Sequence, residues 1–597
     1  MRIAIVICLS CCLGYFPQSI AQSPRNKGIN PSKSVVLGMP EIPYEKSNFT
    51  QTATYQEAVS WYKSVKLNFA NQCELINIGK SDMGRDIYVF HIKTLNEVGK
   101  NTLPVESNPV KIIINNNIHP GEPEGTDACM MLVRDILSDP HRFRSIRQLV
   151  DIYIVVQYNV DGTMQRGSYS RANQNGPAAY GFRATANNLD LNRDFVKCDS
   201  KNTQALEQFV SRNQFDFFID NHTSNGADYQ YTLTYFHTVA EKLPQHLVPA
   251  MALTDSLLKQ NLNQHGWPTF AYVNTLNEVP DSGLTAFYES PRFATGWAST
   301  HGIIGFTVET HMLKPFHARV DATYAFLEQF ISVVSRPAVI ESLNNDIKRE
   351  QLPSKHQYTR FKLDKSRYDV LPFLGYEFGY KPSGISGAPR LYYNRDKPKT
   401  LQVKYYHHFK PTDSVNMPQF YIIPKSRSAI LERLKWNNVE MQPIGKDSLW
   451  KLKVSYIDQF KTVEQPYEGH YLHHDVSCRD TQIWVPIYKG DFLIKVTPKN
   501  VTFLAAVLEP KSPDSYFCWN FVDDVLQQKE GYSAYVFEDL AVEFLKSHPE
   551  IKQQLAEKVQ RDPVFAKDPG AQLDFVYKHS PYYEYTHRLY PVFRALN

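Results

Sequence analysis

Four short apolar runs, rich in β-branched residues, recur through the first half of the chain. They cover residues 110–114, 152–156, 215–219 and 303–308. Stretches with helical periodicity lie between them, at 125–137 and 202–212, and another precedes them at 55–70. Buried strands that alternate with helices are typical of a sheet covered by helices on both faces. The pattern therefore predicts an α/β fold with a mixed, mostly parallel sheet.

The flanking regions show different patterns. Residues 76–92 have strand-like apolar positions that are interrupted by Ser-Asp-Met-Gly-Arg at 81–85, which predicts a strand, a turn and a strand. After residue 345 the chain is richer in Lys, Tyr and Pro. Strand-like runs there occur at 401–406, 420–423, 481–487 and 492–496, and helical periodicity at 535–545 and 551–559. We therefore expect an α/β domain over 46–345, a β-rich accessory domain over 346–512 and a helical C-terminal segment over 513–597.

The N-terminus has the pattern of an export signal. Arg2 precedes an apolar stretch too short for a permanent membrane span, and Ser19 and Ala21 have the spacing of a cleavage site. We interpret residues 1–21 as a signal peptide and the Pro-containing residues 22–45 as a linker. An uncleaved anchor, or a lipid anchor at Cys11 or Cys12, is the alternative. No later segment is apolar for long enough to cross a membrane, so a periplasmic or extracellular protein is expected.

Composition narrows the classes of function. The 597 residues are 42% apolar and 21% charged, with a formal net charge of +4 and no basic run. These values favour a soluble globular protein and give no indication of nucleic-acid binding. Five cysteines follow the signal peptide, an odd number with wide spacing, so neither a disulfide framework nor a cysteine-held zinc is expected. The sequence does not determine the oligomeric state.

Polar residues follow each of the four apolar runs. The first run leads to His119, the second to residues 159–162, the third to His222, and the fourth to Glu309. Ligands of open α/β sheets bind outside the carboxyl ends of the strands. These residues therefore predict one site assembled from four places in the chain.

His119 and Glu122 are three residues apart, just before a predicted helix, so their side chains can converge on one point. His222 supplies a third ligand from another strand end. Zinc accepts imidazole nitrogen and carboxylate oxygen, and catalytic zinc sites use three protein ligands and leave one position open. One Zn²⁺ per chain is therefore expected at these three residues.

Several segments together resemble the zinc metallocarboxypeptidase family (peptidase family M14). Residues 117–122 (Asn-Ile-His-Pro-Gly-Glu) resemble its zinc-binding HxxE motif. The other similar segments are 187–195 (its substrate-carboxylate segment), 218–223 (its third-ligand strand), 306–309 (its catalytic glutamate strand) and 78–85 (a turn near the start of the domain). The resemblance implies the family's fold for residues 46–345, and hydrolysis of peptides that have a free C-terminal carboxylate.

The resemblance also implies roles for single residues. Glu309 is expected to act as general base and acid. Asn192 and Arg193 are expected to hold the substrate carboxylate, because the planar guanidinium group matches a carboxylate with two hydrogen bonds. Asp190 would accept a hydrogen bond from the far ring nitrogen of His119 and fix its tautomer.

Two further assignments have competitors in the sequence. Arg171 is expected to stabilise the oxyanion, with Arg166 as the alternative. Tyr288 is the candidate for the tyrosine that closes over the substrate, and Arg292 is an alternative substrate contact.

Two other functions are compatible with the pattern. A zinc amidase acting on cell-wall peptides or other acyl-amino acids would use the same metal ligands on a different substrate. A non-catalytic binding protein would keep the fold, but all four of His119, Glu122, His222 and Glu309 are present, which favours an enzyme.

Overall fold

The computed structural model describes residues 38–94, 108–347 and 356–595. The expected signal peptide and most of the expected linker lie outside these residues. At the end of that linker, Ile42 and Tyr44 are fully buried, so the chain packs against the first domain before residue 46. No helix within the described ranges has the length and apolar character needed to cross a membrane.

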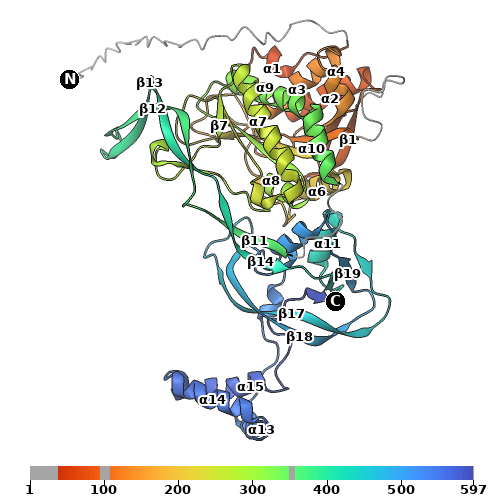
Figure 1. Cartoon of the computed structure of the whole chain (residues 1–597), viewed down its shortest axis with the longest axis vertical. Coiled ribbons are helices and arrows are strands. Elements are labelled where there is room, and N and C mark those ends of the chain that lie inside the picture. The colour runs from red at the N-terminus through yellow and green to blue at the C-terminus, as the bar shows by residue number, and fades with distance from the viewer. Residues whose placement is uncertain (1–37, 95–107, 348–355, 596–597) are drawn as a thin grey trace, which may run out of the picture. The chain divides into compact units, whose positions relative to one another are not determined.

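A mixed eight-stranded sheet forms the centre of the first domain, in the order β1-β2-β4-β3-β5-β10-β6-β7 (Figure 1). Its strands are β1 (Cys73–Lys80), β2 (Asp86–Ile92), β3 (Val110–Asn115), β4 (Val150–Val155), β5 (Phe217–Ser224), β6 (Leu233–His237), β7 (Thr269–Ala271) and β10 (Ile304–His311). The four predicted apolar runs form β3, β4, β5 and β10, which are adjacent and parallel. The predicted α/β fold is therefore confirmed.

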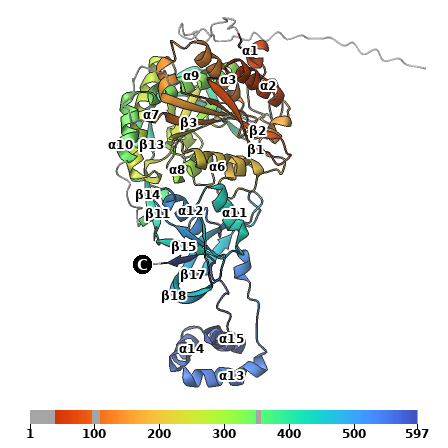
Figure 2. The ribbon, with the colours of Figure 1, turned by 90° about the vertical axis from the view of Figure 1, so that its right-hand side faces the viewer.

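Helices cover both faces of this sheet (Figure 2). They include α2 (Tyr55–Asn68), α3 (Glu124–Ser138), α6 (Lys201–Asn213), α7 (Val248–Gln264), α8 (Ala294–Thr300), α9 (Phe316–Val334) and α10 (Pro337–Ile347). The three predicted helices are α2, α3 and α6. Helix α2 begins with a capping box, in which Thr54 and Glu57 satisfy each other's backbone N–H groups. One apolar core packs α2, α3, α7 and α9 against the sheet, and a second core contains side chains of α6 and α8.

The chain after residue 355 is rich in β-structure, as predicted. A six-stranded sheet has the order β16-β19-β15-β20-β17-β18. Its strands are β15 (Phe420–Ile423), β16 (Gln442–Pro443), β17 (Ser448–Thr462), β18 (His473–Ile487), β19 (Phe492–Lys495) and β20 (Phe593–Ala595), and other strands of this region are β11 (His356–Leu363), β12 (Asp369–Pro382), β13 (Pro389–Tyr406) and β14 (Phe409–Asn416). Helices α11 (Ser428–Trp436) and α12 (Val501–Leu508) accompany the sheet.

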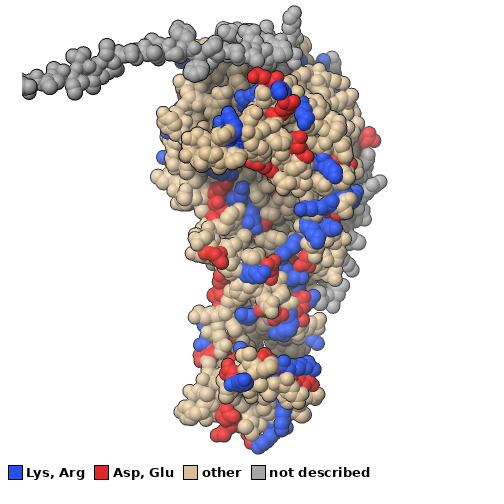
Figure 3. Space-filling model, turned by 90° about the vertical axis from the view of Figure 1, so that its left-hand side faces the viewer, with Lys and Arg blue, Asp and Glu red and all other residues tan. Residues whose placement is uncertain are grey.

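Three helices precede the last strand. They are α13 (Ala534–Ser547), α14 (Pro549–Arg561) and α15 (Pro569–His579), and the first two were predicted. Phe537, Val576 and Tyr577 form a small apolar cluster among them. The chain then returns to the six-stranded sheet, where β20 pairs with both β15 and β17. The face drawn in Figure 3 carries acidic and basic side chains interspersed with one another.

The second apolar core joins the two domains. Ile113, Phe218 and Trp297 of the first domain lie in one buried cluster with Tyr421 and Leu504 of the second. The indole Nε1 of Trp297 also donates a hydrogen bond to Oδ1 of Asn437, at 2.7 Å. The β-rich region therefore completes the covering of the first domain.

A chain that ends at residue 347 is expected to be insoluble or partly unfolded. Each large apolar side chain that the deletion exposes loses about 1.5–3 kcal/mol of burial free energy, and a whole domain is stable by only about 5–15 kcal/mol. Circular dichroism and thermal unfolding of residues 38–347 and 38–597 would measure this. A cooperative, full-length-like melting transition in the shorter chain would contradict the shared core.

Candidate active site

The carboxyl ends of β3, β5 and β10 bring the predicted site residues together. After β3, Asn117 adopts a left-handed conformation (φ 58°) that turns the chain toward His119, and Glu122 follows just before α3. His222 lies on β5 and Glu309 on β10, and the two residues are register partners in adjacent parallel strands. The four residues come from three strand ends, whereas the sequence suggested four; residues 159–162, after β4, do not line the pocket that contains these four residues.

His119, Glu122 and His222 form a buried cluster whose donor atoms all lie within 4.8 Å of one another. Nδ1 of His119 is 3.3 Å from one Glu122 oxygen, and Nδ1 of His222 is 3.1 Å from the other. The far nitrogens, Nε2, contact carboxylates of Asp190 (3.0 Å) and Asp220 (2.8 Å). An imidazole held by a carboxylate on its far nitrogen is the usual arrangement of a metal-binding histidine.

Unpaired buried atoms indicate that the cluster is built around a cation. Nδ1 of His119 and Oε2 of Glu309 are buried without a hydrogen-bond partner in the described part of the chain, although buried polar atoms are normally paired. Burial alone would lower the pKa of His222, but Asp220 and Glu122 raise it well above its usual range. A donor set of two nitrogens and a carboxylate, in surroundings that favour positive charge, fits zinc.

Glu309 is the carboxylate of this group that has no fixed partner. Its pKa is raised to about 8, chiefly by burial; His222 lowers the pKa and the nearby carboxylate of Glu122 raises it. A carboxyl group whose pKa is raised toward neutrality, with one free oxygen, is suited to accept and return a proton.

These side chains line one pocket. Its walls also contain three arginines and several aromatic rings. The additional lining residues are Arg171, Arg183, Asn192, Arg193, Thr223, Ser224, Asn225, Phe236, Tyr272, Phe287, Glu289, Phe293 and Thr307.

The family assignment rests on a segment that contains the whole metal cluster. Residues 58–327 match the family model described as zinc carboxypeptidase. They form a zinc carboxypeptidase domain. By family, this domain is a metallocarboxypeptidase, a peptide hydrolase.

Known proteins resemble it at low identity. Carboxypeptidase 2 of Trichophyton rubrum is 20% identical over 463 residues, which cover 74% of this chain and 79% of that protein. A probable carboxypeptidase 2 of Arthroderma benhamiae is 23% identical over 133 residues, only 22% of either protein. Among solved structures, carboxypeptidase A from Helicoverpa armigera is 14% identical with a TM-score of 0.37, covering 48% of this chain and 74% of that one.

Asn192 and Arg193 of the zinc carboxypeptidase domain both line the pocket. Oδ1 of Asn192 accepts a hydrogen bond from the Ala294 backbone (3.0 Å), which orients its amide. The Arg193 guanidinium lies over the Phe293 ring, 4.2 Å from its centroid. Within the described chain it donates only to the Asn192 carbonyl (2.7 Å), so further donors are available for an anion.

The region after residue 355 braces the segment that carries these two residues. Oε2 of Glu468 accepts a hydrogen bond from the backbone N–H of Asp190 at 2.8 Å. Arg433 and His470 both contact the Asp199 carboxylate, at 2.9 and 2.8 Å. The accessory region therefore holds the segment beside the metal cluster from outside the zinc carboxypeptidase domain.

Arg171 also reaches the cluster, but its donors are occupied. Its guanidinium donates to Glu122 (2.6 Å), to Gln174 (2.6 Å) and to the Thr223 carbonyl (2.7 Å). Arg183, which the sequence did not single out, lines the same pocket. It pairs with Asp190 at 2.8 Å and lies 3.6 Å from Glu122, but its side chain remains 44% exposed, against 15% for Arg171. Arg183 is therefore better placed than Arg171 to donate to a ligand.

Tyr288, the residue expected to close over the substrate, and its competitor Arg292 lie away from the pocket. The Tyr288 ring packs against Phe361 and Phe409, at centroid distances of 5.9 and 5.2 Å, and does not line the pocket. Arg292 pairs with Asp514 at 2.7 Å. Tyr272, Phe287 and Phe293, which are near Tyr288 in the chain, do line the pocket.

Some residues of the site that the sequence analysis did not name could have been found from the sequence. Asp220 is two residues before His222 on one strand, and residues two apart share a face, so its contact with His222 follows from the strand period. Arg183 lies in an irregular segment where no periodicity distinguishes it from Arg166 or Arg171.

Replacing the two arginines is expected to have different effects. Arg183→Met should lower kcat/KM by about 10²–10³-fold, the usual loss for one oxyanion donor, and leave zinc content unchanged. Arg171→Met should first weaken zinc binding, because it removes the cation beside Glu122. Zinc analysis and peptide kinetics on both variants would measure this. The reverse pattern would return the oxyanion role to Arg171.

Proposed function

We propose that this metallocarboxypeptidase removes residues from the C-terminus of peptides, with one zinc ion held by His119, Glu122 and His222. The observation that carries the proposal is an unpaired carboxylate and a guanidinium group with available donors lining the pocket that contains the metal cluster. Zinc, when bound, supplies a Lewis acid.

The residues of the chain have complementary tasks in this scheme. Glu309 takes a proton from the attacking water and returns it to the leaving amine. Asn192 and Arg193 bind the free C-terminal carboxylate and so place the last peptide bond beside Glu309. Arg183 donates to the carbonyl oxygen as it gains charge, with Arg171 as the alternative donor.

The carboxylates of Asp190 and Asp220 keep the two histidines in a form that can bind a metal. Asp190 and Asp220 accept at Nε2 of His119 and His222, and this contact favours the tautomer in which Nδ1 carries a lone pair. The same contacts fix the orientation of both rings. Arg171 holds the Glu122 carboxylate, and it lowers the pKa of that carboxylate well below its usual range against the effect of burial.

The location and the substrate class are part of the proposal. The basic and apolar N-terminal segment supports export to the periplasm or the exterior. An amidase that cleaves cell-wall peptides or acyl-amino acids would share the metal cluster, but it would not require a free C-terminal carboxylate. The available donors of Arg193 favour the carboxypeptidase over the amidase.

Glu309→Gln is expected to lower kcat by about 10²–10⁴-fold, the usual contribution of a general base, while about one zinc per chain is retained. Kinetics on N-blocked peptides and metal analysis would measure both, with the exposed Glu278→Gln as the control. C-terminal amidation of the same peptides should abolish cleavage by the wild type. An active Glu309→Gln variant would refute the role of this glutamate, and equal cleavage of amidated peptides would favour the amidase.

A further inference from the structure

A second cluster of side chains that can bind a metal lies in the accessory region. Asp369, His407 and His408 place one carboxylate oxygen and two imidazole nitrogens within 4.8 Å of one another. Nε2 of His407 is 2.7 Å from Oδ2 of Asp369, and the centroids of the two imidazole rings are 4.2 Å apart. Ligand atoms around a tetrahedral zinc ion are separated by roughly 3.3 Å, given metal–ligand bonds of about 2.0–2.2 Å. The cluster is therefore close to the spacing that one ion requires.

The backbone explains why these two adjacent histidines share one side. Neighbouring residues of a strand point to opposite faces, but His407 and His408 lie in the short connection between β13 and β14. Asp369 is the first residue of β12 and the register partner of Tyr405, two residues before His407. The main-chain oxygen of His408 accepts a hydrogen bond from the N–H of Asp364 at 2.8 Å. The chain thus holds both histidines beside Asp369, where it passes from the β12–β13 pair to the β11–β14 pair.

The cluster has free ligand atoms and is open to solvent. Among the residues that the structure describes, the His408 ring makes no hydrogen bond or ion pair, and the His407 ring is hydrogen-bonded only to Asp369. The side chains of His407 and Asp369 are 32% and 57% exposed, so an ion has an entry path. Two imidazoles favour zinc and its first-row neighbours over calcium and magnesium, which bind oxygen ligands.

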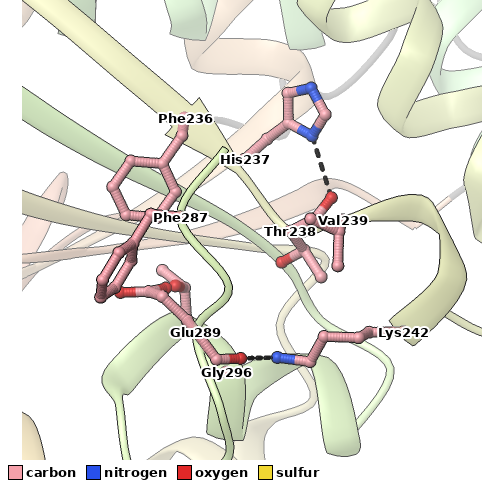
Figure 4. Close-up of a pocket in the computed structure, with 9 residues that line it drawn as sticks. Phe236, His237, Thr238, Val239, Lys242, Phe287, Glu289 and Gly296 are labelled. Carbon is pink, nitrogen blue, oxygen red and sulfur yellow. Dashed lines mark hydrogen bonds between the residues drawn. The ribbon is translucent and has the colours of Figure 1, made fainter. Parts of the chain in front are cut away.

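The first domain brings a second carboxylate to this place. Glu241 belongs to the short helix η2 (Ala240–Lys242). Its Oε1 accepts a hydrogen bond at 3.2 Å from the backbone N–H of Phe409, the residue after His408. Lys242, the next residue of η2, donates to the main-chain oxygen of Glu289 in the wall of the active-site pocket (Figure 4). Helix η2 therefore contacts the accessory region on one side and the pocket wall on the other.

Main-chain hydrogen bonds join the same connection to the active-site pocket. The last two residues of β13 pair with β9 (Leu284–Thr285), and the carbonyl of Tyr406 accepts a hydrogen bond from the N–H of Ala286 at 2.8 Å. Phe287, the next residue, lines the pocket, and His407 directly follows Tyr406. An ion held by His407 would therefore fix the end of the strand to which this pocket wall is bonded.

We propose that Asp369, His407 and His408, with Glu241 as the fourth ligand, form a second site for a divalent transition metal, for which zinc is the probe. The bound ion stabilises the junction between the accessory strands and the first domain. The site shares no ligand with the cluster of His119, Glu122 and His222, and it does not depend on the proposed carboxypeptidase function.

The zinc content of the full chain at saturation, measured after equilibrium dialysis, tests the site. The wild type should bind about two zinc ions and His408→Gln about one, because a divalent ion needs its complete ligand set. His119→Gln, which removes a catalytic ligand, should keep the accessory ion. His474→Gln is the matched control, an exposed histidine beside Asp475, and should bind as much zinc as the wild type. Equal zinc content in the wild type and His408→Gln would overturn the assignment.

Thermal unfolding distinguishes a metal site from a simple ion pair. Zinc beyond the first equivalent should raise the Tm of the wild type, because an ion that binds only the native state stabilises it, and magnesium should not. His408→Gln and Asp369→Asn should both lose this response. Glu241→Gln should weaken binding of the second ion by about 10–100-fold, the usual loss for a supporting carboxylate. A response to zinc that persists in both His408→Gln and Asp369→Asn would refute the site, and unchanged affinity in Glu241→Gln would refute the fourth ligand.

Discussion

The burial of several carboxylates around two imidazoles is the constraint on which the rest of the molecule depends. Glu122, Glu309, Asp190 and Asp220 lie in or against one pocket, and isolated buried charges are costly unless they are paired. Arginines offset part of this charge. The protein therefore has a site that a divalent cation completes, and the surrounding elements keep its acids from moving apart.

Because of this constraint, the residues next to the metal cluster have little space for larger side chains. Gly121 lies where a side chain would collide with Arg171, since a Cβ there would be 2.6 Å from Cδ of the arginine. Gly125 lies equally close to Asn116 and Asn221, so α3 begins directly against the ends of β3 and β5. On the outer side, Glu468 and Arg433 hold the segment around Asp190 and Asp199. The accessory region is thus part of the architecture of the pocket, which the change in composition near residue 345 gave no reason to expect.

Much of the fold was predictable because its strands are buried on both faces and so form continuous apolar runs, as in β3 and β5. The metal cluster was predictable because ligand chemistry restricts the residue types at strand ends. The contacts made by residues in long loops could not be predicted. An arginine such as Arg183 acquires its position only from the packing of an irregular segment. Tyr288 shows the same limit: it is adjacent to Phe287, which lines the pocket, yet its own ring points into a different aromatic cluster. The bracing by Glu468 joins residues far apart in the chain, which a single sequence does not reveal.

The position of β20 has a consequence for how the chain reaches its native state. This short strand lies inside the six-stranded sheet, between β15 and β17, although it follows the other strands of that sheet in the chain. The sheet therefore cannot close until residue 595 has been synthesised, and the apolar core that it shares with the first domain stays incomplete until then. The first apolar core contains no described residue of the β-rich region, so only the second core has to wait for this strand.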